Sequence, residues 1–359
     1  MKKNKLAIVT LTVANYGNRL QNLAAQMLFE DLGYKVETIH NPFEPQFNQT
    51  VHNLKNIIKL IFNKKKYAAG VLREKSFSQF DRKYIHFSNL WINKQSDRKR
   101  ANKRYDYFAC GSDQLWNPTT YNYGANNFAM FADSYKKITI APSFGVTEFP
   151  EKRRKEFQDY LKSFKHLSVR EKTGAEIIYN LTGQEAEVVL DPTLMFDADI
   201  WSEFEKKPEW LNEEKFILNY TLGKSYPSDW IKNLADKYGF GIINLMDTSN
   251  IDYFTTSPAG FLYLIHHSQL MVTDSFHGSV FSVLFRRPLV IVERKDEFVS
   301  MNTRLDNLID LFQLQDRRYD VVSSSENPLD CNYNHADAVL KNTRRSSYTF
   351  LKNALSDAN

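Results

Sequence analysis

The residues best suited to carry chemistry lie between a strand and a helix in the last third of the chain. Asp274, Ser275 and His277 follow a buried strand expected at 270–273 and precede an apolar helix expected at 279–286. In open α/β sheets, ligands bind at the carboxyl ends of the strands. A helix start also offers unpaired N–H groups and partial positive charge. These residues suit an anion site with a proton carrier. Taken alone, however, the pattern favours the alternative that Asp274 or Ser275 only caps the helix and His277 is an ordinary turn residue, and only the rest of the chain can reverse this preference.

Other expected strands end in polar residues in the same way. These strands are expected at 5–11, 105–110, 138–141, 167–169 and 187–190. Asn15, Asn18 and Arg19 follow the first strand, Asp113 the second, Ser143 the third, Arg170 the fourth and Asp191 the fifth. Because parallel strands end at one edge of a sheet, these side chains are expected to share a crevice. The cations and proton carriers, Arg19, Arg170 and His277 together with Arg304, suit a small, multiply charged anion.

Several of these residues also have structural interpretations. Asp113 can cap a turn, and Arg170 can pair with Glu171 or Glu176. Asp191 precedes Pro192, and an Asp before a Pro often fixes a turn, so a structural role is favoured for it.

Known metal and cofactor motifs are missing. The chain has no His-x-x-x-His or Cys-x-x-Cys pair and no calcium loop, so no metal site is predicted. It also has no phosphate-binding P-loop and no Gly-x-Ser-x-Gly nucleophile. The first strand-to-helix loop contains only Gly17, which disfavours a dinucleotide cofactor. No cofactor is therefore expected.

Strands and helices alternate along most of the 359 residues, a length that favours two domains. Periodicity weakens between 197 and 212. We therefore predict an α/β protein with one Rossmann-like domain over 1–200, a second over 212–334, and a C-terminal helix within 335–359.

Positive charge is concentrated in one segment, 51–105, which we interpret as a basic insertion in the first domain. It holds fifteen Lys or Arg against three acidic residues, whereas the whole chain has a net charge of only +5. Apolar residues recur at helical spacing from 51 to 62, followed by three lysines. Such a helix either lies on an anionic membrane surface through 51–66 or packs on the core with a solvated basic face.

Two distant cysteines and the lack of a long apolar run fit a cytoplasmic protein. The basic helix adds an expected peripheral contact at the inner face of the membrane.

The motifs together resemble the polysaccharide pyruvyl transferase family. The resemblance rests on Gly111-Ser112-Asp113-Gln114-Leu115-Trp116-Asn117, Ser168-Val169-Arg170-Glu171, Asp191-Pro192-Thr193 and Thr273-Asp274-Ser275-Phe276-His277-Gly278, and on the opening Asn15-Tyr16-Gly17-Asn18-Arg19. It implies two facing Rossmann-like domains, as in two-domain glycosyltransferases, with the acceptor side on the first, the donor side on the second, and the last helix packing back on the first. It also implies phosphoenolpyruvate as donor and a cell-surface sugar, free or lipid-linked, as acceptor. The products would be a pyruvate ketal and phosphate.

The resemblance also suggests roles for the residues. His277 is the expected general acid, and it is expected to gain its proton when the trianionic donor binds, because a helix N-terminus alone disfavours imidazolium. Asp113 is the expected acceptor of hydroxyl protons, and Arg170 is expected to bind the donor phosphate or carboxylate. The remaining expected substrate contacts are Ser275, Gly278, Arg304, Asn15, Arg19 and Ser143. One branch of the family has an arginine where this chain has Ser275, so Arg304 or Arg19 is expected to replace it.

Two other functions compete with this interpretation. One is a nucleotide-sugar glycosyltransferase of the same architecture. The other is a non-enzymatic protein that binds membranes or nucleic acid through 51–105. That segment lacks a nucleic-acid motif and leaves the polar strand ends unexplained, so no nucleic-acid partner is predicted.

Overall fold

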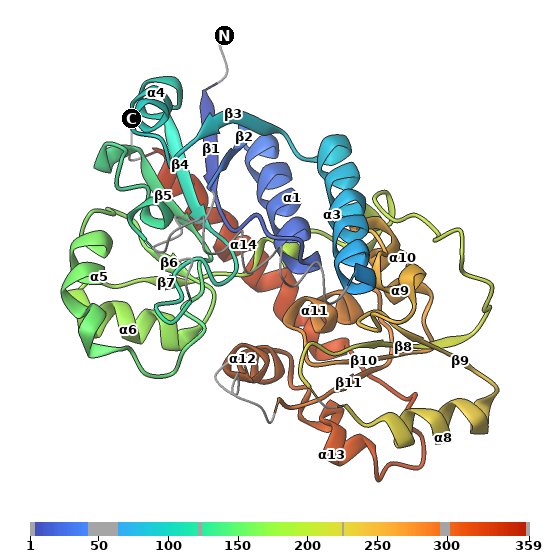
Figure 1. Ribbon diagram of the computed structural model, residues 1–359. Coiled ribbons are helices and arrows are strands. Elements are labelled where there is room, and N and C mark those ends of the chain that lie inside the picture. Colours follow the sequence, from blue (N-terminus) through green and yellow to red (C-terminus); the bar gives the residue numbers. More distant parts are fainter. Residues whose placement is uncertain (1–3, 42–63, 121–123, 225, 295–301, 357–359) are drawn as a thin grey trace.

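The computed structural model describes residues 4–41, 64–120, 124–224, 226–294 and 302–356, which form two α/β units (Figure 1). The first unit has a five-stranded parallel sheet in the order β3-β2-β1-β4-β5. Its strands are β1 (Lys5–Val9), β2 (Lys35–His40), β3 (Phe87–Trp91), β4 (Tyr107–Gly111) and β5 (Lys137–Ile140). The second unit has a parallel sheet in the order β11-β10-β8-β9. Its strands are β8 (Phe216–Tyr220), β9 (Gly241–Asn244), β10 (Leu270–Thr273) and β11 (Leu289–Ile291). The predicted fold class is confirmed.

Helices connect and cover these strands. In the first unit they are α1 (Tyr16–Asp31), α3 (Lys64–Tyr84), α4 (Gln95–Arg104), α5 (Arg154–Leu161) and α6 (Lys172–Thr182), with a separate strand pair, β6 (Ser168–Val169) and β7 (Glu187–Val188). After α7 (Ala198–Ser202), the second unit contains α8 (Ser228–Tyr238), α9 (Ile251–Phe254), α10 (Pro258–His267), α11 (Phe276–Leu284), α12 (Asn302–Phe312) and α13 (Tyr319–Val322). Short 3-10 turns are η1 (Ala125–Phe128), η2 (Ser134–Lys136), η3 (Glu151–Arg153), η4 (Pro192–Met195) and η6 (Gln315–Arg317).

The central strands are apolar because helices cover both faces of each sheet. In β1 the four residues from Leu6 to Val9 are fully buried, and Leu6 lies opposite Val36 on one side and Tyr107 on the other. Parallel strands buried on both faces have continuous apolar runs of this kind. All the polar residues that follow β1 and β4 therefore emerge at the same edge of the sheet.

The basic segment is not an insertion outside the sheet, which corrects the sequence-based expectation. Its described part contains α3, the edge strand β3 and α4, and β3 pairs in parallel with β2. The strand was missed because an edge strand is only half buried: Ser88 and Leu90 face the core while Asn89 and Trp91 are exposed. The amphipathic helix predicted at 51–62, and the membrane contact predicted from 51–66, fall outside the residues whose side chains the structure describes.

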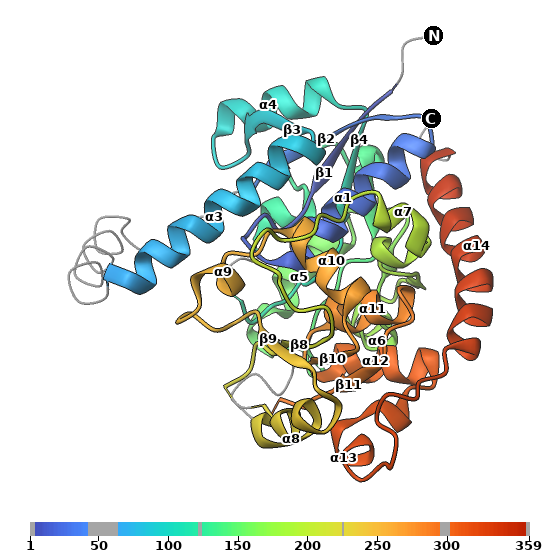
Figure 2. The same ribbon diagram turned by 90° about the vertical axis from the view of Figure 1, so that its right-hand side faces the viewer.

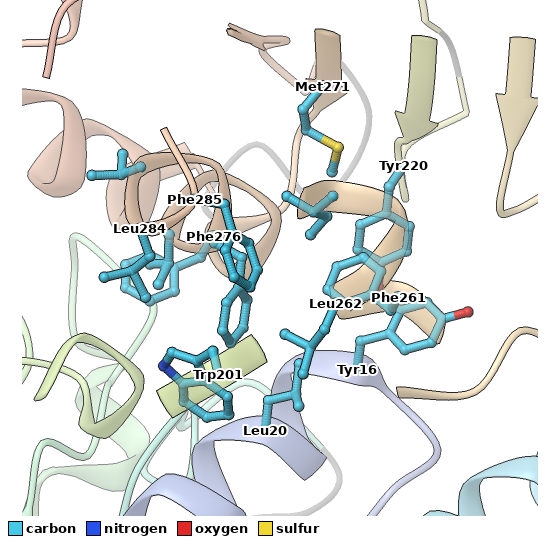
Figure 3. Packing of buried hydrophobic residues seen from close by; sticks show 14 of the residues in the cluster. Tyr16, Leu20, Trp201, Tyr220, Phe261, Leu262, Met271, Phe276, Leu284 and Phe285 are labelled. Atoms are coloured by element: carbon cyan, nitrogen blue, oxygen red, sulfur yellow. The ribbon is translucent and has the colours of Figure 1, made fainter. Parts of the chain in front are cut away.

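A cluster of aromatic residues joins the two units (Figure 3). Tyr16 of α1 stacks on Phe261 of α10, with ring centroids 4.2 Å apart, and meets Tyr220 of β8 edge-on at 5.4 Å. Its hydroxyl donates a hydrogen bond to the Thr256 carbonyl oxygen at 2.9 Å. Buried aromatic pairs of this kind contribute both apolar area and a preferred geometry. The first turn of α1 is thereby fixed against the second unit.

The last helix, α14 (Asn334–Ser356), runs along one side of the molecule from the second unit to the first (Figure 2). Phe350 and Leu351 share a buried cluster with Leu6 and Ile8 of β1. The Tyr107 hydroxyl donates to the Leu355 carbonyl oxygen at 3.2 Å. The predicted return of the C-terminal helix to the first domain is confirmed. No helix among the described residues is both long and apolar enough to cross a bilayer.

Candidate active site

A pocket of about 180 Å³ lies between the two units, and we call it the His277 pocket. It is lined by Leu11, Val13, Asn15, Asn18, Asp113, Gln114, Thr120, Leu222, Ser275, Phe276, His277, Arg294 and Arg304. Pockets for drug-sized ligands have volumes of roughly 300–1,000 Å³. The His277 pocket therefore suits a smaller molecule, and its polar lining requires that molecule to be polar.

His277 lies in the first turn of α11. Ser275 caps this helix, since its hydroxyl oxygen accepts a hydrogen bond from the Gly278 N–H at 3.3 Å. The helix thus begins at Phe276, three residues earlier than predicted, and His277 is buried, with 4% of its surface exposed. The structural reading of Ser275 as a cap is correct, and Ser275 also lines the pocket.

A second helix starts at the same pocket. We expected α1 to begin near Arg19, but it begins at Tyr16, with Asn15 as its cap. The Asn15 side-chain oxygen accepts from the Asn18 N–H at 3.3 Å. Asn15 and Ser275 both line the pocket, so two helix N-termini contribute positive potential there.

Gly17 makes the contact between the two helix starts possible. A Cβ atom added at Gly17 would lie 2.1 Å from His277 Nδ1, closer than any real contact. The only glycine of the first loop therefore serves close packing of α1 on the imidazole ring.

We expect Gly17→Ala to displace the His277 ring and lower turnover at least a hundredfold, because misplacement of a reacting group by about 1 Å can cost that much. Gly70→Ala in α3 is the matched control, since a Cβ there meets nothing within 4 Å. Initial rates and melting temperatures of both variants check this. Full activity in folded Gly17→Ala would show that the position of His277 does not matter.

Asp191 connects His277 with Arg170. Its Oδ1 lies 3.8 Å from His277 Nε2, and its Oδ2 accepts a hydrogen bond from Arg170 Nη1 at 3.0 Å. Burial alone raises the pKa of Asp191, but His277, Arg170 and Thr193 together hold it well below its ordinary value. Asp191 is therefore a permanent anion. It fixes a turn through Thr193, as expected, and it also orients two site residues, which its sequence context did not predict.

Asp113 lies opposite, on the loop after β4, with a positive φ of 57°. Asn18 Nδ2 donates to its Oδ2, and Arg304 Nη1 donates to its Oδ1 at 3.2 Å. Burial raises the pKa of Asp113, but His277, Arg170 and Arg304 outweigh this effect and lower it. A carboxylate stabilised in this way is a weak base, so Asp113 is better suited to orienting a hydroxyl than to taking its proton.

Three arginines lie at or behind the pocket: Arg294 and Arg304 line it, and Arg170 does not. Arg170 lies 3.8 Å from Asp113 and 3.6 Å from Glu171, with Asp191 as its nearest partner. Its Nε and Nη2 have no hydrogen-bond partner among the described residues. Burial lowers the pKa of Arg304 to about 10; Asp113 opposes this, whereas Arg170 and Arg294 add to it. This mutual repulsion would be relieved by a bound anion.

Arg294 is the site residue that the sequence reading missed. It lines the pocket, and its Nε donates to Asp274 Oδ2 at 2.9 Å. Asp274 in turn accepts hydrogen bonds from the backbone N–H groups of Leu222 and Gly223, both at 2.7 Å. Arg294 follows β11 by three residues, so the strand-end rule applied to that strand would have found it. Arg294 and Arg304 are the two arginines of the pocket lining.

Three predicted substrate contacts lie elsewhere. Arg19 points to α3, where its Nε is 2.8 Å from Asp81 Oδ1, and it is 5% exposed. Ser143 is fully buried and holds the Asp113 loop through a backbone hydrogen bond of 2.7 Å. Gly278 packs on β10, since a Cβ there would lie 2.7 Å from Thr273 Oγ1. None of the three lines the His277 pocket, and neither does Arg170, which packs behind it against Asp113.

One group of possible metal ligands occurs among the described residues, away from this pocket. The ligand atoms of Glu205, His266 and His267 lie within 4.8 Å of one another. His266 Nδ1 is 2.9 Å from Glu205, so a histidine–carboxylate hydrogen bond accounts for the contact. Sequence spacing did not indicate this group, because Glu205 lies on a different segment from the two histidines.

Comparison with known proteins identifies the family of the chain. Residues 15–296 match the family model described as polysaccharide pyruvyl transferase. No curated protein matches the chain. Among solved structures, a UDP-GlcNAc 2-epimerase from Methanocaldococcus jannaschii aligns with a TM-score of 0.45 and 11% identity over 94% of this chain and 99% of that one. A proposed UDP-N-acetylglucosamine 2-epimerase from Listeria monocytogenes aligns with a TM-score of 0.43 and 11% identity over 97% and 98%.

Proposed function

The chain belongs to the polysaccharide pyruvyl transferase family, and we propose that it transfers the enolpyruvyl group of phosphoenolpyruvate to two hydroxyls of a sugar, forming a pyruvate ketal and releasing phosphate. The observation that carries the proposal is the convergence of Arg294, Arg304, His277 and two helix N-termini on one small pocket, with Arg170 packed behind it against Asp113 and Asp191. A compact trianion is the ligand that such a pocket stabilises best.

The first step in the proposed reaction adds a proton to the methylene carbon of the donor. This proton comes from His277, the one imidazole in the pocket lining. The C=C electron pair forms the new C–H bond and leaves a cationic carbon. A sugar hydroxyl attacks that carbon, and its proton returns to His277.

The second step breaks the bond between that carbon and the phosphate oxygen. Phosphate leaves with the bond pair, the second sugar hydroxyl attacks, and its proton ends on the departing phosphate. The proton of the first hydroxyl thus replaces the one that His277 gave to the methyl group. The proton of the second hydroxyl leaves with the phosphate as hydrogen phosphate. Arg170, Arg294 and Arg304 stabilise the charge that builds on phosphate and carboxylate.

The charge of His277 depends on its surroundings in this scheme. Two helix N-termini lie beside the ring, and Asp191 lies 3.8 Å from its Nε2. The donor adds negative charge on the other side. We therefore expect the His277 ring nitrogens to change from neutral to protonated shifts in 15N NMR when phosphoenolpyruvate is added at pH 7; neutral shifts in the saturated complex would exclude the role of acid.

The activity is tested by incubating the protein with phosphoenolpyruvate and a panel of nitrophenyl and lipid-linked glycosides. The proposal predicts a pyruvate-sized mass gain on an acceptor, with one phosphate released per ketal. Phosphate release without any acceptor adduct would indicate hydrolysis instead and would contradict it.

We also propose that the acceptor is presented at a membrane surface. The support is the charge of 51–105, fifteen basic residues against three acidic ones. Basic segments bind anionic leaflets with about 1 kcal/mol per Lys or Arg near the surface. The protein should co-sediment with vesicles containing phosphatidylglycerol at low salt and be released at high salt; equal binding to neutral vesicles would count against the charge-based contact.

A further inference from the structure

A second hollow opens on the first unit, beside the His277 pocket. It has a volume of about 780 Å³ and lies between α1, α3 and strands β2 and β3. Its lining is Thr12, Arg19, His40, Asn41, Ser78, Asp81, Arg82, Ile85, Phe87 and Trp91. The proposed chemistry uses none of these residues, so the hollow needs its own explanation.

Three stacked rings form one wall. His40 at the end of β2 lies parallel to Trp91, with ring centroids 4.4 Å apart and an angle of 11°, and parallel to Phe87 at 4.9 Å and 13°. Burial lowers the pKa of His40, and a hydrogen bond to the Ser88 backbone only partly opposes this, so the middle ring is neutral at pH 7. Trp91 is nevertheless 43% exposed. An indole that stacks on one ring and is open to solvent is a ready surface for further stacking.

Charged side chains form another part of the lining. Arg19 pairs with Asp81 and is almost fully buried, yet its Nη1 has no hydrogen-bond partner among the described residues. A buried guanidinium N–H without a partner costs free energy unless a ligand or water satisfies it. Arg82 and Asn41 also belong to the lining and add further hydrogen-bonding groups.

A lining that combines a flat ring stack with charged side chains matches a sugar ring. The C–H face of a pyranose stacks on an indole, while its hydroxyls both donate to carboxylates and accept from guanidinium groups. An inorganic anion would leave the ring stack without a function. An aliphatic ligand would offer no hydrogen-bonding group to the buried Arg19–Asp81 pair.

The hollow is next to the His277 pocket along the chain. Thr12 lines the hollow, and its neighbours Leu11 and Val13 line the pocket. On α1, Asn18 lines the pocket and the next residue, Arg19, lines the hollow. One loop and one helical turn thus separate the two spaces, and a ligand longer than one sugar can contact both.

We propose that this hollow, the Trp91 platform, binds the acceptor sugar unit next to the one that receives the ketal. The assignment rests on the proposed function for its place in the reaction, but sugar binding at Trp91 can be tested without it. Binding at the Trp91 platform makes an acceptor of two or more sugars a better substrate than the terminal sugar alone.

The kinetic test compares acceptors of one sugar with acceptors of two or more. Trp91→Ala should raise KM about tenfold for the longer acceptors, whereas kcat, the KM for phosphoenolpyruvate and the KM for the one-sugar acceptor stay unchanged. Trp91→Phe should recover most of the loss. Tyr135→Ala, which truncates an aromatic residue 60% exposed elsewhere, is the matched control. An equal loss on both acceptor classes, or no loss on either, would overturn the proposal.

The binding test separates this proposal from the transfer reaction. The protein is labelled with fluorotryptophan, the Trp91 signal is assigned with Trp91→Phe, and 19F NMR spectra are recorded with neutral gluco-, galacto- and manno-oligosaccharides of two to four units. A saturable shift of the Trp91 signal supports the platform even if no ketal forms in any assay. If no oligosaccharide shifts that signal, or if AMP and UMP shift it and the sugars do not, the platform is not a sugar site.

Discussion

Replacing His277 by alanine is expected to lower kcat by about a thousandfold and to leave the melting temperature within a few degrees of the wild type. General acid catalysis contributes roughly 10²–10⁴ in rate, and no other residue lining the pocket offers a proton carrier that is active near neutral pH. The measurement is the steady-state rate of phosphate release with donor and acceptor both saturating.

Two further variants make this result specific. His277→Gln keeps a polar side chain of similar size but carries no exchangeable acidic proton, so it should be as slow as alanine. His335→Ala removes an exposed histidine at the start of α14 and should be fully active. If His277→Gln retained more than a tenth of the wild-type rate, His277 would position the substrate and not protonate it.

Arg170→Lys is expected to raise the KM for phosphoenolpyruvate by about a hundredfold. Arg170 is buried and donates a hydrogen bond to Asp191 at 3.0 Å. Its Nε and Nη2 have no hydrogen-bond partner among the described residues and lie 3.6 Å from Glu171 and 3.8 Å from Asp113. Lysine keeps the charge but loses the planar fork that binds an oxyanion through two parallel hydrogen bonds. The measurement is the dependence of initial rate on donor concentration.

The control for Arg170 is an equally buried arginine away from the pocket. Arg317 donates to the carbonyl oxygens of Leu289, Pro328 and Asp330. Arg317→Lys should lower the melting temperature and leave the donor KM unchanged. Arg170→Ala is less informative, since breaking a buried ion pair costs about 3–5 kcal/mol of stability and would confuse folding with binding. If Arg170→Lys and Arg317→Lys both lowered the melting temperature and neither changed the KM for phosphoenolpyruvate, Arg170 would be a structural residue.

Most of the fold was predictable because its buried elements have strong apolar periodicity. The strand at 270–273 has the bounds expected from the sequence. Elements with weak periodicity were not predictable in this way. Strand β3 has only one buried face and lies among charges, and the first turn of α1 looks like a loop. That turn is helical because Asn15 caps it and Tyr16 stacks on Phe261, which is a contact 245 positions away in the chain.

The same reasoning explains which site residues were found. The strand-end rule placed Asn15, Asp113, Ser275, His277 and Arg304 around one pocket, and Arg170 packs directly behind it. It misplaced Arg19 because consecutive residues of a helix point about 100° apart. Asn18 therefore reaches Asp113 in the pocket, whereas Arg19 reaches Asp81 on α3. Helix phase can be assigned only once the start of the helix is known.

The central claim is that the His277 pocket binds phosphoenolpyruvate as its donor, and thermal unfolding tests it most directly because no acceptor is needed. At a ligand concentration 100 times Kd, binding stabilises the folded state by about 2.7 kcal/mol. We predict that phosphoenolpyruvate raises the melting temperature by several degrees in the wild type and by much less in Arg170→Lys, while UDP and UDP-sugars leave it unchanged. Stabilisation by UDP or a UDP-sugar, with none by phosphoenolpyruvate, would contradict this account and favour a nucleotide-sugar enzyme.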